Sequence, residues 1–186
     1  MPKTIAGPLF YSPVLKDENL KFLDSVEQEL GYPLVFKKVY GSLGTGVYLV
    51  NNKKELISLY KENCRQPIQF QEYIASSFGK SLRVLIIDKK VIGAFQRYNE
   101  VDFRSNYGNT ASSKKYPLTG KYLDMAEKIA DEFDIEYAGI DLLFGENDEP
   151  VLCEINSNAF FEEFEKVTHI NVAKIFMEMV QRKMVK

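Results

Sequence analysis

The feature that most constrains the fold is a pair of β-strand patterns separated by a very short polar turn. Residues 82–87 and 91–98 are both rich in branched and aromatic side chains, and only residues 88–90 lie between them. A connection this short joins antiparallel neighbours, because a parallel pair needs a crossover of a dozen or more residues. A second pair of strand patterns, residues 137–144 and 150–155, flanks another tight turn. The sequence therefore predicts antiparallel sheets.

Helical spacing of apolar residues occurs elsewhere in the chain. Helices are predicted over residues 17–30, 53–63, 119–133 and 168–182, and further strands over residues 33–38, 47–50 and 68–73. We expect Asp17 to cap the first helix and Gly31 to end it. Residues 99–115 are polar and predict a loop, for which composition favours a disordered linker. The mixed order of helices and strands favours an α+β fold over a doubly wound parallel sheet.

Charge and composition exclude several classes of protein. The 24 Lys and Arg residues are outnumbered by 26 Asp and Glu, whereas binding to nucleic acid calls for an excess of basic charge. No apolar run reaches the roughly 20 residues that span a bilayer, and we see no secretory signal, so no membrane partner is expected. Two cysteines without Cys-x-x-Cys spacing favour a reduced, cytoplasmic compartment. The single histidine, His169, cannot by itself build a zinc site or a Ser-His-Asp triad.

A glycine-rich turn at residues 41–46 lies between two strand patterns, the first of which carries Lys37. Such a turn can present backbone N–H groups to phosphates, because glycine lets the main chain approach a ligand closely. An ordinary flexible hairpin is the alternative interpretation. The Gly-Lys-Ser sequence at residues 79–81 does not form a P-loop, since Ile74 stands where that motif needs glycine.

Three oxygen-bearing side chains accompany the last two strand patterns. Asp141 lies inside an apolar run, where an ionised carboxylate is costly unless it is paired or bound to a metal. Glu154 and Asn156 are two residues apart, so they project from the same face of their strand. If the two strands pair as a hairpin, the three side chains offer an all-oxygen cluster of the kind that suits Mg²⁺. A solvated sheet face, with Asn156 starting a turn, is the alternative.

The order of these features resembles that of a known superfamily. The landmarks are residues 33–37 with the turn at 41–46, then Gln71-Glu72-Tyr73-Ile74, and residues 79–83, 102–106, 138–141 and 154–158. Together they make the chain similar to the ATP-grasp superfamily, and within it to RimK-type ligases, over essentially its whole length. The resemblance implies an ATP-grasp fold in which two α+β lobes with antiparallel sheets sandwich ATP. Their expected extents are an N-terminal segment at residues 1–13, an N-lobe at 14–73 and a C-lobe at 74–186.

The resemblance also implies roles for particular side chains. Contacts to ATP would come from Lys37, Gly41, Ser42, Gly44, Gly46, Glu72, Tyr73, Ser81, Arg104, Ser105 and Asn106. Of these, Lys37 and the turn residues would contact phosphates, and Glu72 and Tyr73 would bind adenine through main-chain groups. Arg83 and Arg97 would be the catalytic residues, facing the phosphoryl group or the carboxylate substrate. Asp141, Glu154 and Asn156 would hold one or two Mg²⁺ ions, with Mn²⁺ as the alternative metal.

Members of this family phosphorylate a carboxylate with ATP and let an amine displace phosphate from the acyl phosphate. The resemblance thus implies an ATP-dependent carboxylate–amine ligase that adds an amino acid such as glutamate to an amine or peptide. Because relatives carry a further N-terminal domain, such a domain or a homo-oligomer is the expected partner. A non-catalytic nucleotide-binding module that acts with a partner is the alternative function.

Overall fold

The computed structural model describes residues 1–11 and 16–185, and the chain divides into two compact units, Met1–Ile74 and Ala75–Lys186. Both units combine helices with an antiparallel sheet, so the predicted α+β class is confirmed. The predicted limit between residues 13 and 14 lies outside the described residues. Within the described part of the chain, no helix is long and apolar enough to cross a membrane.

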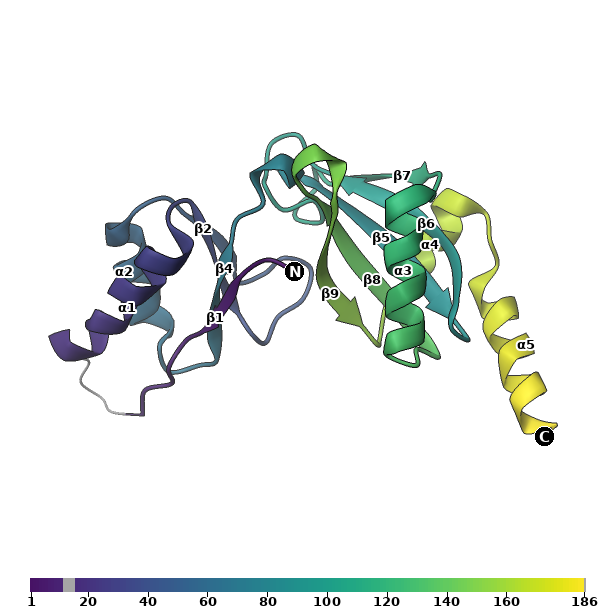
Figure 1. Ribbon diagram of the computed structural model, residues 1–186, viewed down its shortest axis with the longest axis horizontal. Helices are drawn as coiled ribbons and strands as arrows, with labels where there is room; N and C mark the ends of the chain where they lie inside the picture. The colour runs from purple at the N-terminus through teal and green to yellow at the C-terminus, as the bar shows by residue number, and fades with distance from the viewer. Residues whose placement is uncertain (12–15, 186) are drawn as a thin grey trace. The chain divides into compact units, whose positions relative to one another are not determined.

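The first unit is built on a four-stranded sheet in the order β1-β4-β2-β3 (Figure 1). Its antiparallel strands are β1 (Thr4–Ala6), β2 (Leu34–Lys38), β3 (Val47–Val50) and β4 (Ile68–Glu72). Helices α1 (Asp17–Leu30) and α2 (Lys53–Asn63) lie side by side and pack on this sheet. The core between helices and sheet is formed by buried apolar side chains, among them Leu23, Val26, Leu34, Phe36, Leu56, Tyr60 and Phe70.

Local sequence explains where these helices begin and end. The side chain of Asn52 accepts a hydrogen bond from the backbone N–H of Glu55 at 3.0 Å, which caps α2. Gly31 follows the last residue of α1 with a φ of 65°, as the predicted stop requires. The predicted cap at Asp17 is wrong by one residue. Lys16 has the extended backbone of an N-cap, and its N–H donates to the Asn19 side chain.

The second unit holds a five-stranded antiparallel sheet in the order β7-β6-β5-β8-β9. Its strands are β5 (Lys80–Ile87), β6 (Lys90–Tyr98), β7 (Ser112–Tyr116), β8 (Tyr137–Phe144) and β9 (Pro150–Asn156). Short 3₁₀ helices cover Ala75–Ser77 and Glu146–Asp148. The two tight turns join β5 to β6 and β8 to β9, as predicted, and β5 also pairs with β8. Residues far apart in the sequence therefore meet at the centre of the sheet.

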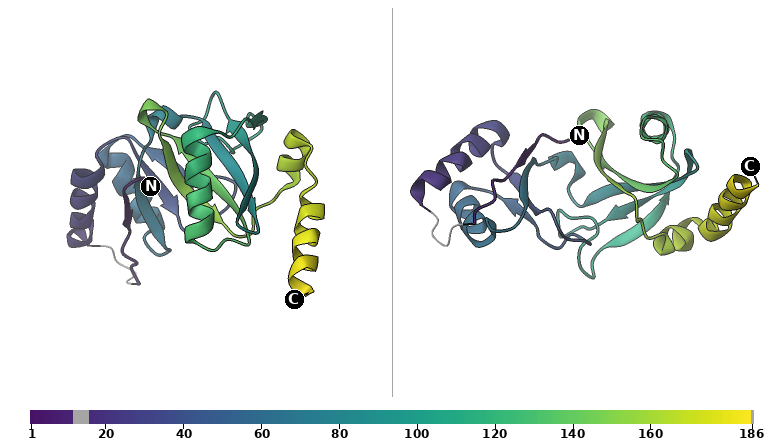
Figure 2. Two further views of the ribbon diagram at one scale, coloured as in Figure 1. Left: turned by 45° about the vertical axis from the view of Figure 1, so that its right-hand side comes forward. Right: turned by 90° about the horizontal axis from the view of Figure 1, so that it is seen from below.

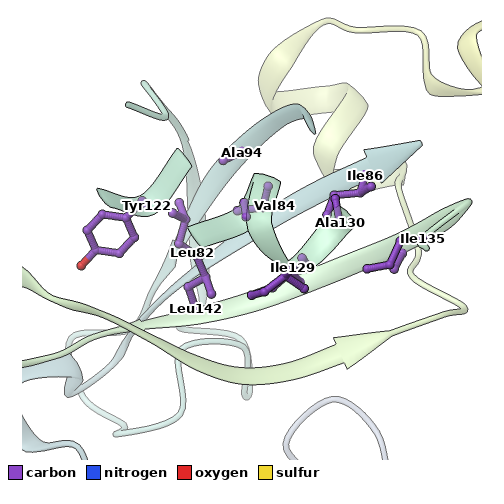
Figure 3. Packing of buried hydrophobic residues seen from close by; sticks show 12 residues of the cluster. Leu82, Val84, Ile86, Ala94, Tyr122, Ile129, Ala130, Ile135 and Leu142 are labelled. Carbon is purple, nitrogen blue, oxygen red and sulfur yellow. The ribbon is translucent and has the colours of Figure 1, made fainter. Parts of the chain in front are cut away.

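Alternate side chains of β5 pack on opposite faces of this sheet. Leu82, Val84 and Ile86 pack against α3 (Gly120–Glu132), as Figure 3 shows. Leu85 and Ile87 belong to a second core with α4 (Glu162–Thr168) and α5 (Val172–Met184). Figure 2 shows α3 and α4 on opposite faces of the sheet. By the same alternation, β5 directs Arg83 to the face on which α4 and α5 pack.

Two sequence-based assignments in this unit are wrong. The last part of the predicted loop, residues 112–115, belongs instead to the edge strand β7, whose polar and largely exposed side chains give no apolar pattern. The helix predicted over residues 168–182 corresponds to α5, which begins only at Val172, because residue 168 belongs to the preceding helix α4. Thr168 ends α4, His169 adopts a left-handed backbone with φ of 61°, and the Asn171 side chain caps α5.

Candidate functional site

A buried ion-pair cluster lies on one face of the five-stranded sheet. The strand register places Arg83 of β5 opposite Asp141 of β8, and Asp141 opposite Glu154 of β9. Arg83 Nε and Nη2 donate to Asp141 Oδ1 and Oδ2 at 2.5 and 2.6 Å. Arg97 Nη1, from β6, lies 3.3 and 3.5 Å from the same two oxygens. Both predicted catalytic arginines and one predicted metal ligand therefore meet at one point.

The arginines decide the ionisation of this cluster. Asp141 is only 7% exposed, and burial by itself raises the pKa of a carboxyl group. Hydrogen bonds and charge from Arg83, with smaller contributions from Arg97 and Glu154, outweigh burial and hold the pKa of Asp141 below its usual value. Burial lowers the pKa of Arg97, but a guanidinium group stays protonated in proteins. Two guanidinium groups thus contact one ionised carboxylate, that of Asp141.

The other predicted metal ligands come from β9. Glu154 is exposed and lies directly across from Asp141, so the two carboxylates share one face of the sheet. Asn156 pairs with Gly139, and its Oδ1 accepts a hydrogen bond from Asn158 N–H at 3.0 Å. In the described part of the chain, no three Asp, Glu, His or Cys side chains gather as metal ligands. The available donor set is two carboxylates and one amide, all hard oxygen ligands.

One buried side chain, which the sequence did not single out, organises the loop after β6. Asn99 is 3% exposed, and its Oδ1 accepts hydrogen bonds from Val101 N–H, Asp102 N–H and the Thr110 hydroxyl, each at 3.1 Å. Its Nδ2 donates to Tyr107 O at 2.9 Å. The expectation of a disordered linker is therefore wrong, because these hydrogen bonds fix both ends of the loop.

Gly79 closes the base of the same loop. Its N–H donates to Phe103 O at 3.0 Å, and its carbonyl accepts from Asn99 N–H at 2.8 Å. The residue has a φ of 59°, and a Cβ there would lie 2.0 Å from Asn99 O. Only glycine permits this close approach. A glycine directly before a strand was the one sequence signal that could have identified this position.

Four of the residues predicted to contact ATP belong to this loop or to β5. Arg104 Nε and Nη2 donate to the two Asp102 oxygens at 3.0 and 2.8 Å, and its guanidinium lies 3.3 Å from the centre of the Tyr107 ring. These contacts fix the plane of the cation. The hydroxyl oxygens of Ser81 and Ser105 are 2.7 Å apart and buried, so they tie the loop to β5. Asn106 is exposed.

In the first unit, Lys37 and the glycine-rich turn are close together along the chain. Lys37 Nζ donates to Gln71 Oε1 of β4 at 2.5 Å. In the turn, Gly44 and Gly46 have φ values of 74° and 80°, which favour glycine. The N–H of Thr45 donates a hydrogen bond to Ser42 O at 3.0 Å. A Cβ on Gly41 would lie 2.8 Å from the carbonyl oxygen of Thr45.

Glu72 and Tyr73 lie at the end of β4. The backbone N–H of Glu72 donates to Lys3 O at 2.8 Å, and its carboxylate accepts from Lys3 N–H at 3.0 Å. Tyr73 is half-buried, and burial raises the pKa of its phenol. These contacts attach the start of the chain to the end of β4.

Solved structures of ATP-dependent ligases share this architecture. The ATP-grasp ligase PsnB, solved with minimal precursor, Mg and ADP, matches with a TM-score of 0.67 at 21% identity, over 97% of this chain and 52% of PsnB. D-alanine–D-alanine ligase from Bacillus anthracis matches with a TM-score of 0.68 at 20% identity, over 97% and 60% of the two chains. The fold is therefore that of the ATP-grasp ligases, as predicted.

Sequence comparison identifies the family to which the chain belongs among proteins of this fold. The family model of the RimK-like ATP-grasp domain matches residues 5–180, and the chain belongs to that family. It is 32% identical over 175 residues to the uncharacterized protein MG012 of Mycoplasma genitalium, covering 92% of this chain and 60% of the relative. It is 32% identical to a probable α-L-glutamate ligase of Legionella pneumophila (86% and 54% covered) and 31% to human N-acetylaspartylglutamate synthase A (85% and 41% covered). The chain thus spans about half the length of these relatives.

Proposed function

We propose that this chain is the ATP- and Mg²⁺-binding catalytic portion of a carboxylate–amine ligase. In the proposed reaction an amino acid is joined to an amine through an acyl phosphate, with release of ADP and phosphate. Membership of the RimK-like family supports the use of ATP, and the relatives named as glutamate ligase and N-acetylaspartylglutamate synthase support an amino acid of the glutamate type. The single observation that carries the proposal is the buried cluster of Arg83, Asp141 and Arg97.

Arginine pairs suit this reaction, because phosphoryl transfer to a carboxylate brings several anionic oxygens together. Catalysis then depends on neutralising charge and on positioning the reactants. Arg83 is held by both oxygens of Asp141, whereas Arg97 contacts them only at 3.3 and 3.5 Å. We therefore assign Arg97 the direct contact with a phosphoryl or carboxylate oxygen, and Arg83 the task of fixing Asp141.

Nucleotide contacts would be divided among several elements. In this proposal Lys37 and the turn at residues 41–46 bind phosphates, and main-chain groups of Glu72 and Tyr73 bind adenine. Arg104 and Asn106 reach the nucleotide from the loop after β6. Ser81 and Ser105 support that loop through their mutual hydrogen bond.

Asp141, Glu154 and Asn156 would hold Mg²⁺, or Mn²⁺ in its place. A carboxylate has about four lone-pair sites, so Asp141 can accept hydrogen bonds from Arg83 and still offer an oxygen to a cation. Mg²⁺ in proteins is usually bound by one or two carboxylates together with water and phosphate oxygens, and this donor set fits that pattern. When bound, the ion would neutralise phosphate charge.

The test is release of ADP and ligated product when the chain is incubated with ATP, Mg²⁺, glutamate or another amino acid, and amine or peptide acceptors. We expect release that depends on both substrates, is lost in Arg97→Gln and is kept in Arg182→Gln, an exposed arginine of α5. Tight binding of ATP without release for any substrate would favour the non-catalytic nucleotide-binding module. Failure to bind ATP would contradict both functions.

A further inference from the structure

A short chain of hydrogen bonds in the first unit leads from Lys37 to the start of the polypeptide. Lys37 Nζ donates to Gln71 Oε1 at 2.5 Å. Gln71 Nε2 donates to Thr4 Oγ1 at 2.9 Å, and the Thr4 hydroxyl lies 3.0 Å from Pro2 O, to which it donates. Gln71 is only 5% exposed, and β1 places Thr4 directly opposite it in the sheet.

The direction of this chain is fixed by hydrogen-bonding capacity. Pro2 O can only accept, so the single hydroxyl proton of Thr4 is committed to it. Thr4 Oγ1 can then only accept from Gln71, which requires the amide nitrogen of Gln71 to face Thr4. The amide oxygen must therefore face Lys37. An amide in the opposite orientation would direct two N–H donors at the ammonium group.

Because the hydrogen-bond partner of Lys37 is the neutral amide of Gln71, the lysine keeps its full positive charge. An amide oxygen holds an ammonium group in place without neutralising its charge, whereas a carboxylate at the same position would neutralise it. A buried, neutral and oriented acceptor is thus suited to present a full positive charge to an anion that arrives later. Pre-organisation of this kind reduces the entropy that the lysine side chain loses on binding.

We propose that Gln71 is a positioning residue for Lys37, and that Thr4 of β1 sets the orientation of its amide. The proposal rests on the proposed function in one respect, namely that Lys37 contacts the phosphates of ATP. It extends that function by assigning two residues to the phosphate contact and by giving the three-residue strand β1 a part in nucleotide affinity.

The first test compares ATP–Mg²⁺ affinity, measured by calorimetry, in four variants of the full chain. Lys37→Met should weaken binding about tenfold or more, the loss expected for a charge-assisted hydrogen bond. Gln71→Glu should weaken it to a similar extent, because the new carboxylate competes with phosphate for the ammonium group. In Lys37→Met/Gln71→Glu the second substitution should add no further loss. Circular dichroism of each variant verifies folding, and Gln28→Glu, at an exposed position of α1, is the matched control.

The second test uses Thr4, which can be changed without touching the amide or the lysine. Thr4→Val keeps the shape of the side chain but frees the Gln71 amide to rotate, and should weaken ATP binding about fivefold. Thr4→Ser keeps the hydroxyl and should bind ATP with wild-type affinity. ¹⁵N NMR of the lysine ammonium groups supplies a readout that a purely structural role would not change. The Lys37 signal should be protected from exchange in wild type and Thr4→Ser, and lost in Thr4→Val.

The outcomes separate this inference from the proposed function. If Lys37→Met binds ATP as wild type does, the phosphate contact of Lys37 is wrong. If Lys37→Met binds weakly but Gln71→Glu and Thr4→Val bind normally, the positioning role is overturned and the phosphate contact stands. A further loss from Gln71→Glu in the Lys37→Met background would also overturn it, since Gln71 would then act without the lysine.

Discussion

Asp141 is the residue on which the buried charges of the second unit depend. It is the common acceptor for Arg83 and Arg97, two guanidinium groups that are themselves largely buried. A buried ion pair adds little net stability over apolar residues of the same volume, but removing one partner leaves the other charge uncompensated. Substitutions at Asp141 and at its exposed neighbour Glu154 should therefore have different consequences.

We expect Asp141→Asn to lower the free energy of unfolding by about 3–5 kcal/mol in the absence of any ligand, because both arginines lose their anion. Urea unfolding of the wild type and the variant measures this loss. Asp124→Asn, at an exposed position of α3, is the matched control and should change stability by less than about 0.5 kcal/mol. A loss at Asp141 as small as that of the control would contradict the ion-pair assignment.

Acid should remove the same stabilisation. Because the folded-state pKa of Asp141 lies below its ordinary value, the folded chain binds this proton less readily than the unfolded chain does. The contribution is thus fully present above about pH 4 and is lost as the pH falls through the lowered folded-state pKa. Urea midpoints between pH 6 and pH 2 should fall less steeply for Asp141→Asn than for the wild type. Parallel curves would contradict the prediction.

Glu154→Gln should keep the fold and selectively weaken metal-dependent ATP binding. The substitution preserves size and hydrogen-bonding capacity but removes one negative charge from the proposed ligand set, and Mg²⁺ strongly prefers anionic oxygen. Affinity for ATP–Mg²⁺ should fall about tenfold, which corresponds to about 1.4 kcal/mol, while the melting temperature without ligand holds. Thermal melts with and without ATP–Mg²⁺ test this, with Glu178→Gln on α5 as control. A variant that melts lower without ligand yet keeps the full ligand-induced shift would show that the metal assignment is wrong.

At the scale of elements, the loop after β6 depends on the close approach of backbone at Gly79. Gly79→Ala introduces a Cβ 2.0 Å from Asn99 O and should cost about 3 kcal/mol or more, since the backbone itself must shift. Gly108→Ala is a matched control, because Gly108 also has a positive φ but a Cβ on it would meet no atom within 4 Å. It should cost only about 1 kcal/mol. Urea unfolding compares the two, and equal losses would show that the contact is unimportant.

The glycine-rich turn between β2 and β3 should respond to nucleotide. Most of its side chains are exposed, and no apolar group anchors its tip, so its amides should exchange rapidly in the free chain. If the turn covers phosphates, amide hydrogen exchange at residues 42–45 should slow when ATP–Mg²⁺ is added. The helix α2 provides an internal reference that should not change. Equal exchange in both states would count against a phosphate-covering turn.

Elements defined by local sequence were predicted well. The limits of β3, α2 and β8 match the patterns, because capping residues and apolar runs determine them. The strand β7 was missed because a polar edge strand buries few side chains. The pairing of Arg83 with Asp141 could not be predicted from residues alone, since it depends on the register between β5 and β8, which are 58 residues apart at this point.

For the whole molecule, the balance of charge within the cluster has a consequence for metal binding. Two guanidinium groups already compensate the buried carboxylate of Asp141, so the cluster attracts free Mg²⁺ only weakly, whereas ATP brings further negative charge. We expect Mg²⁺ alone to leave the melting temperature nearly unchanged. ATP–Mg²⁺ at about one hundred times its Kd should stabilise the chain by about 2.7 kcal/mol. Differential scanning calorimetry checks this, EDTA should abolish most of the shift, and a large shift with Mg²⁺ alone would contradict it.

The dependence of a whole loop on Asn99 means that exchanging one atom of this side chain would change the loop selectively. Four hydrogen bonds converge on this single side chain, three at its oxygen and one at its nitrogen. Deamidation would replace the nitrogen by a second oxygen, which can still serve Val101, Asp102 and Thr110 but repels the carbonyl of Tyr107. The middle of the loop, where Tyr107 stacks on Arg104, would then be released, while the hydrogen bonds to Val101, Asp102 and Thr110 hold the two ends in place. Asn99→Asp, the product of that hydrolysis, should therefore show faster amide hydrogen exchange around residue 107 than the wild type, with exchange at residues 101 and 102 unchanged.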